Sequence, residues 1–170
     1  MKKLLLTIAM AVPLAAVCAQ DSEEAKTRPN KQEIVGMMTK ISRMPAQQQS
    51  GKVDTINLSA SKTPRSDFMF CTGLAYLGNY KAQKCLGEAY ENGRGIVEDL
   101  SEAYTWYAIA ADNKIPDKDT QEKLQAEKDR IENKLLAAYP HPTEDDLADM
   151  IKAQKSRIEQ YQADLKRSPK

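Results

Sequence analysis

The stretch AQKCLGEAYENGRGIVEDLSEAYTWYAIAADN, residues 82–113, constrains the fold more than any other part of the chain. Its apolar residues recur at helical spacing on both sides of a turn that contains Gly93 and Gly95, and glycine tolerates the positive φ at which helices often end. Asp99 stands three residues before Glu102, which is the spacing of a capping box at the start of a helix. The pattern therefore predicts two helices joined by a tight turn, a helical hairpin.

This hairpin resembles one Sel1-like repeat, a relative of the tetratricopeptide repeat, and the match is in register across residues 82–113. The resemblance implies that the small residues let the two helices approach closely, that the aromatic residues fill the seam between them, and that the glycines and the aspartate shape the turn. It also implies a non-catalytic adaptor that holds other proteins together. The residues that carry the match are Ala82, Leu86, Gly87, Tyr90, Gly93, Gly95, Ile96, Asp99, Ala103, Trp106, Tyr107, Ala110 and Ala111.

A single repeat of this kind needs neighbours, because one hairpin cannot bury both of its apolar faces. Upstream, residues 65–77 carry an apolar helical face and occupy the place of the second helix of a preceding repeat, so we interpret them as a degenerate half-repeat. The repeat region then spans 64–113. We expect an all-α fold, a short α-α solenoid of the Sel1 or tetratricopeptide type with flanking capping helices.

The C-terminal part, 114–170, predicts two further helices. The first has apolar positions within 121–139. The second begins after Thr143, a residue type that caps helix N-termini, and carries a heptad-spaced stripe with Gln154 as its polar member. We expect these helices to form an antiparallel hairpin that covers the open end of the repeat. The alternative is that 143–165 pairs with another chain, although the monomer is the favoured state.

The N-terminus has the pattern of a bacterial secretory signal peptide over residues 1–19, with two lysines, an apolar run and small residues before a cleavage site near Ala19. Cys18 leaves a lipoprotein reading open. Residues 20–63 then predict a linker with a short amphipathic helix at 31–44 and an otherwise mostly irregular segment. A periplasmic or secreted location follows from this reading.

The charge balance is close to neutral. Cleavage removes Lys2 and Lys3, which leaves 23 basic against 24 acidic residues and a net charge of −1. Interspersed charges of this kind argue against nucleic acid or an anionic membrane as the partner. No later stretch approaches the 18 apolar residues of a membrane span, so no stable membrane insertion is expected after cleavage.

Cys71 and Cys85 remain after cleavage, 14 positions apart. An even number of cysteines in an oxidising compartment predicts a disulfide, and the spacing lacks the CxxC pattern of a redox or zinc motif. Two reduced, buried thiols are the alternative. A redox or metal-handling protein that uses this pair is a third reading, which a stable disulfide would exclude.

The inventory of chemical groups predicts no catalytic, cofactor-binding or metal-ligating residues. The single histidine, His141, lies between two prolines in a turn, and neither a zinc site nor a Ser-His-Asp arrangement is available from one histidine. We therefore expect a protein-interaction adaptor or scaffold of the bacterial envelope, without enzyme activity or cofactor, and its protein partner is not specified. Two alternatives stay open: an enzyme of the cysteine-rich Sel1-like type acting on β-lactams, and a component of a sodium-driven flagellar motor, to which the layout is similar.

Overall fold

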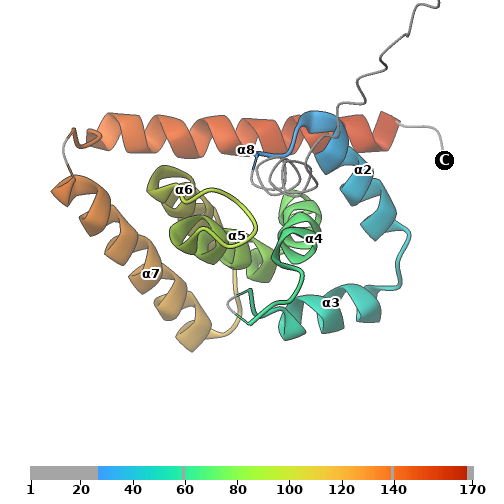
Figure 1. The fold of residues 1–170 in the computed structure, drawn as a ribbon. Helices are drawn as coiled ribbons and strands as arrows, with labels where there is room; N and C mark the ends of the chain where they lie inside the picture. Colours follow the sequence, from blue (N-terminus) through green and yellow to red (C-terminus); the bar gives the residue numbers. More distant parts are fainter. Residues whose placement is uncertain (1–26, 59, 139, 168–170) are drawn as a thin grey trace, which may run out of the picture.

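Helices make up all of the regular structure that the computed structural model describes, which is residues 27–58, 60–138 and 140–167. The expected all-α class is confirmed for this part of the chain, and the expected signal peptide at 1–19 lies outside it. Figure 1 shows the arrangement. The helices are α2 (Lys31–Ser42), α3 (Ala46–Thr55), α4 (Pro64–Tyr76), α5 (Tyr80–Asn92), α6 (Leu100–Ala111), α7 (Lys118–Ala137) and α8 (Glu144–Arg167).

The helical hairpin predicted at 82–113 is present as α5 and α6, which pack on each other. Helix α5 ends at Gly93, which adopts the left-handed conformation with φ 63°, and Gly95 follows with φ 76°. The side chain of Asp99 accepts a hydrogen bond of 3.0 Å from the backbone N–H of Glu102 and so caps α6, as its sequence position predicts. Local residues therefore set where α5 ends and α6 begins, while Gly95 also packs closely against the backbone of Pro64 at the start of α4.

Gly87 permits the close contact within this hairpin. A Cβ atom at this position would lie 2.9 Å from the ring of Tyr107, closer than side chains approach one another. The hydrogen of glycine leaves room for the ring, which is 1% exposed. The predicted role of Gly87 in helix approach matches this geometry.

Helices α4, α5, α6 and α7 pack one after the other in chain order, and α2 packs on the free side of α4. Each of them turns its apolar residues inward, and one continuous buried cluster runs from α2 to α8. Helix α7 buries only Leu124, Ile131 and Leu135 and exposes charged residues on its other side. The row of helices therefore ends in a polar face.

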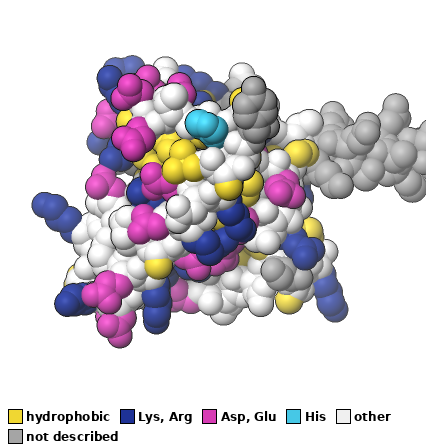
Figure 2. Space-filling model, turned by 90° about the vertical axis from the view of Figure 1, so that its left-hand side faces the viewer, with side chains coloured by type: hydrophobic (Ala, Val, Ile, Leu, Met, Phe, Trp, Pro, Cys, Tyr) yellow, Lys and Arg dark blue, Asp and Glu magenta, His cyan; other side chains and the backbone are white. Residues whose placement is uncertain are grey.

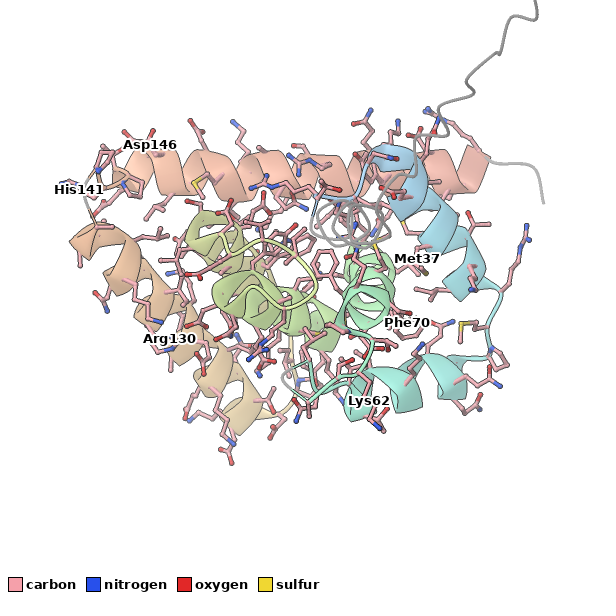
Figure 3. The ribbon with its side chains drawn as sticks, viewed as in Figure 1. Met37, Lys62, Phe70, Arg130, His141 and Asp146 are labelled. Atoms are coloured by element: carbon pink, nitrogen blue, oxygen red, sulfur yellow. The ribbon has the colours of Figure 1, made fainter. Side chains whose placement is uncertain are left out.

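The segment after α2 differs from the expectation. Residues 45–63 were expected to be mostly irregular, but 46–55 form α3. Alanine, glutamine and lysine favour helix formation locally, and Val53 supplies one buried side chain. The ammonium group of Lys52 also lies 4.2 Å from the ring centroid of Phe70, on the side of α4 that faces α3 (Figure 3).

The predicted C-terminal hairpin is wrong in its arrangement. Both helices exist, and Thr143 Oγ1 accepts a hydrogen bond of 3.1 Å from Asp146 N–H at the start of α8. However, α7 packs along α6, whereas α8 turns away and crosses α6, α4 and α2 (Figure 1). The reason is that α7 has one narrow apolar stripe, and this stripe packs on α6. No apolar face of α7 is then left for α8 to pack on.

None of the described helices is both long enough and apolar enough to cross a membrane. Charged side chains of both signs are mixed on the face shown in Figure 2, where His141 is exposed at the turn between α7 and α8.

Candidate functional site

Helix α8 packs across a surface of the protein that is built from α2, α4 and α6. We call this surface the α8 groove and define it by Lys31 of α2, Tyr76 of α4, and Trp106 and Asp112, which lie in α6 and at its C-cap. The helical periodicity of each element decides which of its residues face α8. The apolar faces of α4 and α6 continue beyond the α5–α6 core and reach α8.

Tyr76 is the centre of the groove. Its ring stacks on Tyr161 of α8 with the centroids 5.2 Å apart and meets the ring of Trp106 edge-on at 5.5 Å. The Tyr76 hydroxyl accepts a hydrogen bond of 3.1 Å from Gln154 Nε2, and the Tyr76 carbonyl oxygen accepts one of 2.8 Å from Gln162 Nε2. Burial raises the pKa of Tyr76 above its ordinary value, so the hydroxyl stays protonated at neutral pH.

Gln154 is the buried polar residue of α8. It is 3% exposed, and its Oε1 accepts a hydrogen bond of 2.8 Å from Arg157 Nη1 while its Nε2 donates to Tyr76. Burying an amide costs little when both ends are paired. The polar member of the predicted stripe therefore faces the groove together with its apolar neighbours.

Two ion pairs hold the edges of α8. Lys31 Nζ lies 2.6 Å from Asp164 and 5.5 Å from the centroid of the Tyr161 ring. On the other edge, Lys155 pairs with Asp112. Because these four side chains are partly exposed, the pairs orient the helix more than they stabilise it.

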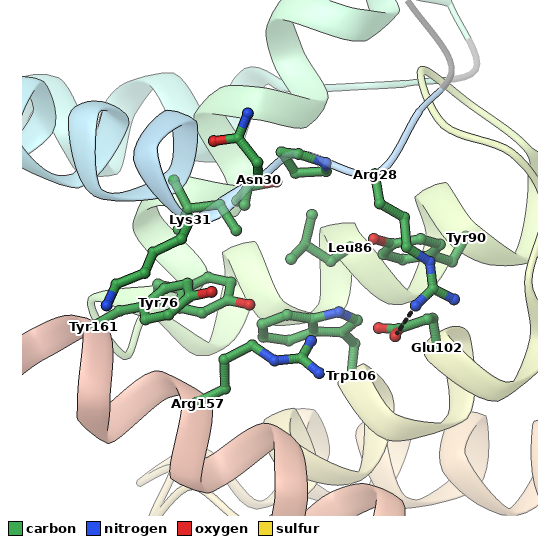
Figure 4. A pocket seen from close by; sticks show the side chains of 13 residues that line it. Arg28, Asn30, Lys31, Tyr76, Leu86, Tyr90, Glu102, Trp106, Arg157 and Tyr161 are labelled. Carbon is green, nitrogen blue, oxygen red and sulfur yellow. Dashed lines mark hydrogen bonds and ion pairs between the residues drawn. The ribbon is translucent and has the colours of Figure 1, made fainter.

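A cavity of about 260 Å³ remains between α8 and residues 28–31 (Figure 4). Tyr76, Leu86 and Trp106 form its apolar part, while Arg157 reaches into it from α8 under the Trp106 ring. Helix α8 therefore does not fill the groove.

Arg28 closes the other side of this cavity. Its guanidinium pairs with Asp99 at 2.5 Å and with Glu102 at 2.9 Å, so that Asp99 both caps α6 and binds the N-terminal segment. Burial raises the pKa of Glu102, and the positive charges of Arg28 and Arg157 oppose this shift. The two cationic neighbours therefore favour the ionised carboxylate beside the Trp106 ring.

The residues predicted as the repeat core lie in α5, α6 and the turn between them. Leu86, Tyr90 and Trp106 also line the cavity, so three positions of the hairpin core reach the groove. The predicted side chains that are buried at 8% exposure or less are Ala82, Leu86, Tyr90, Ile96, Ala103, Trp106, Tyr107, Ala110 and Ala111.

Cys71 and Cys85 lie on the facing helices α4 and α5, and both are buried as free thiols in this structure. A hydrogen bond to Cys85, together with burial, raises the pKa of the Cys71 thiol well above its ordinary value. The two sulfur atoms are thus neighbours, and the disulfide stays a prediction.

Sequence reasoning did not identify several residues of the site. Arg28, Tyr76 and Arg157 come from three segments, and no local motif links them. Gln154 and Tyr161 did give a signal, because both belong to the heptad-spaced stripe predicted for the last helix. Among the described residues, no group of histidine, cysteine, aspartate and glutamate side chains is arranged to hold a metal ion.

Comparison with known proteins adds no relative: no family model matches the chain, and no curated protein or solved structure matches it significantly. The resemblance to the Sel1-like family consequently rests on the residues of 82–113.

Proposed function

We propose that the protein is an exported, non-catalytic adaptor of the Sel1-like type, which binds other proteins in the bacterial envelope. In this proposal α4 to α7 form a short α-α solenoid, with α5 and α6 as its one complete repeat. The observation that carries the proposal is the α8 groove, since it is a surface that already accommodates a helix.

The packing order of the helices supports the solenoid interpretation. Each helix from α4 to α7 contacts the next one in the chain, which is the organisation of a repeat array. Repeat arrays need end units with a polar outer face, and α7 exposes charged residues on the side away from α6. The array would accordingly end at α7.

The chemistry of the groove supports protein binding. Aromatic residues such as Tyr76 and Trp106 are enriched at the centres of protein interfaces, and charged residues such as Lys31 and Asp112 are typical of their rims. An amphipathic helix in a groove is a recurring mode of recognition between proteins.

The proposed location can be tested separately from binding. We expect the mature protein to be recovered from the periplasmic fraction with Gln20 as its first residue, as N-terminal sequencing or intact mass would show. A full-length cytoplasmic protein would contradict the export part of the proposal.

Binding is tested by crosslinking in living cells, followed by recovery of the tagged full-length protein from a periplasmic extract. The proposal expects one envelope complex to be recovered reproducibly with wild type. A groove variant, Trp106→Ala, should recover less of it than a control on the exposed face of α8, Lys152→Ala. Failure to recover a complex, combined with turnover of a small molecule, would overturn the proposal.

A further inference from the structure

We propose that Cys71 and Cys85 form a cross-link that only the unfolded chain gains or loses. A disulfide is introduced before α4 and α5 pack on each other, and this packing then closes the pair to thiol exchange. The co-reactant that supplies the oxidising equivalents is a second disulfide, R–S–S–R. The inference goes beyond the adaptor function, and only its timing in the cell rests on the proposed export.

The two cysteines lie in the interior of the folded protein. Cys71 is 0% exposed and Cys85 is 8% exposed, and both belong to the main buried cluster. Phe68 and Ala75, about one helical turn on either side of Cys71, are fully buried, and so is Ala89, one turn after Cys85. Packed side chains of both helices therefore surround the pair.

The electrostatic surroundings of the pair disfavour the reactive form of a thiol. The thiolate, and not the thiol, attacks disulfides and alkylating agents. The hydrogen bond to Cys85 raises the pKa of the Cys71 thiol, burial raises it further, and the negative charges of Asp67 and Glu88 act in the same direction. Reactive cysteines lie at electropositive, partly exposed positions, and this pair has the opposite surroundings.

Exchange also needs space beside the sulfur atoms. One cysteine thiolate attacks R–S–S–R, which forms a mixed disulfide and releases the first R–S⁻. The second cysteine thiolate then attacks the cysteine sulfur of the mixed disulfide and releases the second R–S⁻. The two cysteines give up two electrons and two protons, and the co-reactant leaves as two R–SH. Because the intermediate carries an R group between packed helices, α4 and α5 must separate for it to form.

Separation of α4 from α5 disrupts the centre of the core. Helix α5 packs on both α4 and α6, and Phe68 of α4 meets the ring of Tyr90 of α5 edge-on with the centroids 5.6 Å apart. Central packed elements open at a free energy close to that of global unfolding. The pair therefore reacts only through the unfolded chain, and its redox state records the environment in which the chain folded.

The closed state of the pair is tested by alkylation of the full-length protein, purified with a reductant. The background substitution Cys18→Ser leaves Cys71 and Cys85 as the only cysteines of the chain. The reductant is removed, iodoacetamide is added, and intact mass gives the number of alkylated thiols over time. We expect alkylation in native buffer to be at least about a hundredfold slower than in concentrated urea. Comparable rates in the two conditions would overturn the inference.

The matched control is Ser156→Cys in the same background, since Ser156 is an exposed residue of α8. Its added thiol should react in native buffer about as fast as in urea, which attributes the slow alkylation of the pair to burial.

Oxidised glutathione replaces the alkylating agent in a second series. It should form the disulfide in the unfolded, reduced chain and leave the folded, reduced chain with two thiols. Rapid oxidation of the folded chain would overturn the inference and assign the pair to redox chemistry.

The route of opening is tested with two glycine variants of opposite expected effect on stability. Gly87→Ala brings a Cβ against the Tyr107 ring and should speed alkylation of the folded protein by about fivefold to a hundredfold. Gly36→Ala lies in α2, where a Cβ meets nothing within 4 Å, and should slow it by about twofold to fivefold. If Gly87→Ala does not fold, Gly36→Ala still tests the route. A rate that does not follow stability would show local access to the pair and overturn the inference.

Timing in the cell is tested by deletion of residues 1–19, which leaves the expected mature chain in the reducing cytoplasm. This chain should fold with two thiols and keep them when the lysate is exposed to oxidised glutathione, whereas the exported chain should carry the disulfide. Disulfide formation in the folded cytoplasmic chain would overturn the inference. Failure of the export proposal looks different. The wild-type chain would then also carry two thiols, while the rates measured on the purified protein stay as expected.

Discussion

At the scale of single residues, Tyr76 shows how one side chain connects distant parts of the chain. It belongs to α4, yet its ring and hydroxyl contact Gln154 and Tyr161 of α8, and its ring also meets Trp106 of α6. Because so many contacts converge on one hydroxyl and one ring, substitutions at this position separate polar from aromatic contributions.

The variant Tyr76→Phe removes the hydroxyl and leaves the stacked ring. We expect it to lower the free energy of unfolding by about 1 kcal/mol, because the buried amide of Gln154 loses its acceptor. Urea denaturation measures this difference. Tyr80→Phe is the control for the loss of a tyrosine hydroxyl, and equal stability of both variants would contradict the role of the bond.

Glu91 is the second residue with a measurable consequence. Hydrogen bonding to Arg130 of α7 (Figure 3), with a smaller contribution from Lys134, lowers the pKa of Glu91 to about 2, against burial, which raises it. The pKa is lower in the folded state than the ordinary value of 4.5. The stabilisation is therefore complete above pH 4.5 and is lost as the pH falls towards 2.

The variant Glu91→Gln should accordingly be less stable than wild type at pH 7, and this difference should shrink as the pH falls from 4.5 to about 2. Urea denaturation at several pH values checks the trend. A difference that stays constant across this range would refute the assigned pKa, and Glu159→Gln, at an exposed position of α8, serves as the comparison.

At the scale of elements, glycines inside helices distinguish close packing from open surface. A Cβ at Gly87 of α5 meets the Tyr107 ring, whereas a Cβ at Gly36 of α2 meets nothing within 4 Å. Alanine normally favours a helix more than glycine does. Whether a Gly→Ala change stabilises or destabilises the protein therefore depends on the packing around the glycine.

We expect Gly87→Ala to destabilise the protein by about 1 to 3 kcal/mol, because the Tyr107 ring must move out of its packed position. The matched change Gly36→Ala should stabilise it by about 0.5 to 1 kcal/mol. The midpoints of urea unfolding give both values. If Gly87→Ala were also stabilising, the close approach of α5 and α6 would be wrong.

At the scale of the whole molecule, Cys71 of α4 and Cys85 of α5 lie on two helices that pack on each other. A disulfide between them would act mainly on the unfolded chain, since it closes a loop and reduces the conformations that are lost on folding. The disulfide would therefore stabilise the whole folded chain relative to the unfolded chain. It would require little change in the native contacts of the two helices.

We predict that the protein isolated from an oxidising compartment carries this disulfide, which alkylation of the denatured protein followed by mass measurement would detect. Reduction should lower the free energy of unfolding by about 3 kcal/mol for a loop of this length. Two alkylated cysteines in the unreduced sample would contradict the prediction, and Cys71→Ser should be insensitive to the reductant.

Much of the local structure follows from the sequence alone. The α5–α6 hairpin, its glycine turn, the Asp99 and Thr143 caps and the apolar stripe of α8 were all predictable, because caps and periodicity depend on residues within a few positions of each other. The same local rules missed α3, which has a single buried side chain and owes its place to contacts with α4 and α5.

Only the tertiary structure decided which surface each stripe meets. Periodicity shows that α8 has an apolar face, but it does not distinguish packing on α7 from packing across α2, α4 and α6. The cavity likewise brings together Arg28 and Arg157, which are 129 positions apart and share no local pattern. The physical reason is that burial rewards any complementary partner, so the choice among partners depends on the shape and free area of the whole assembled core.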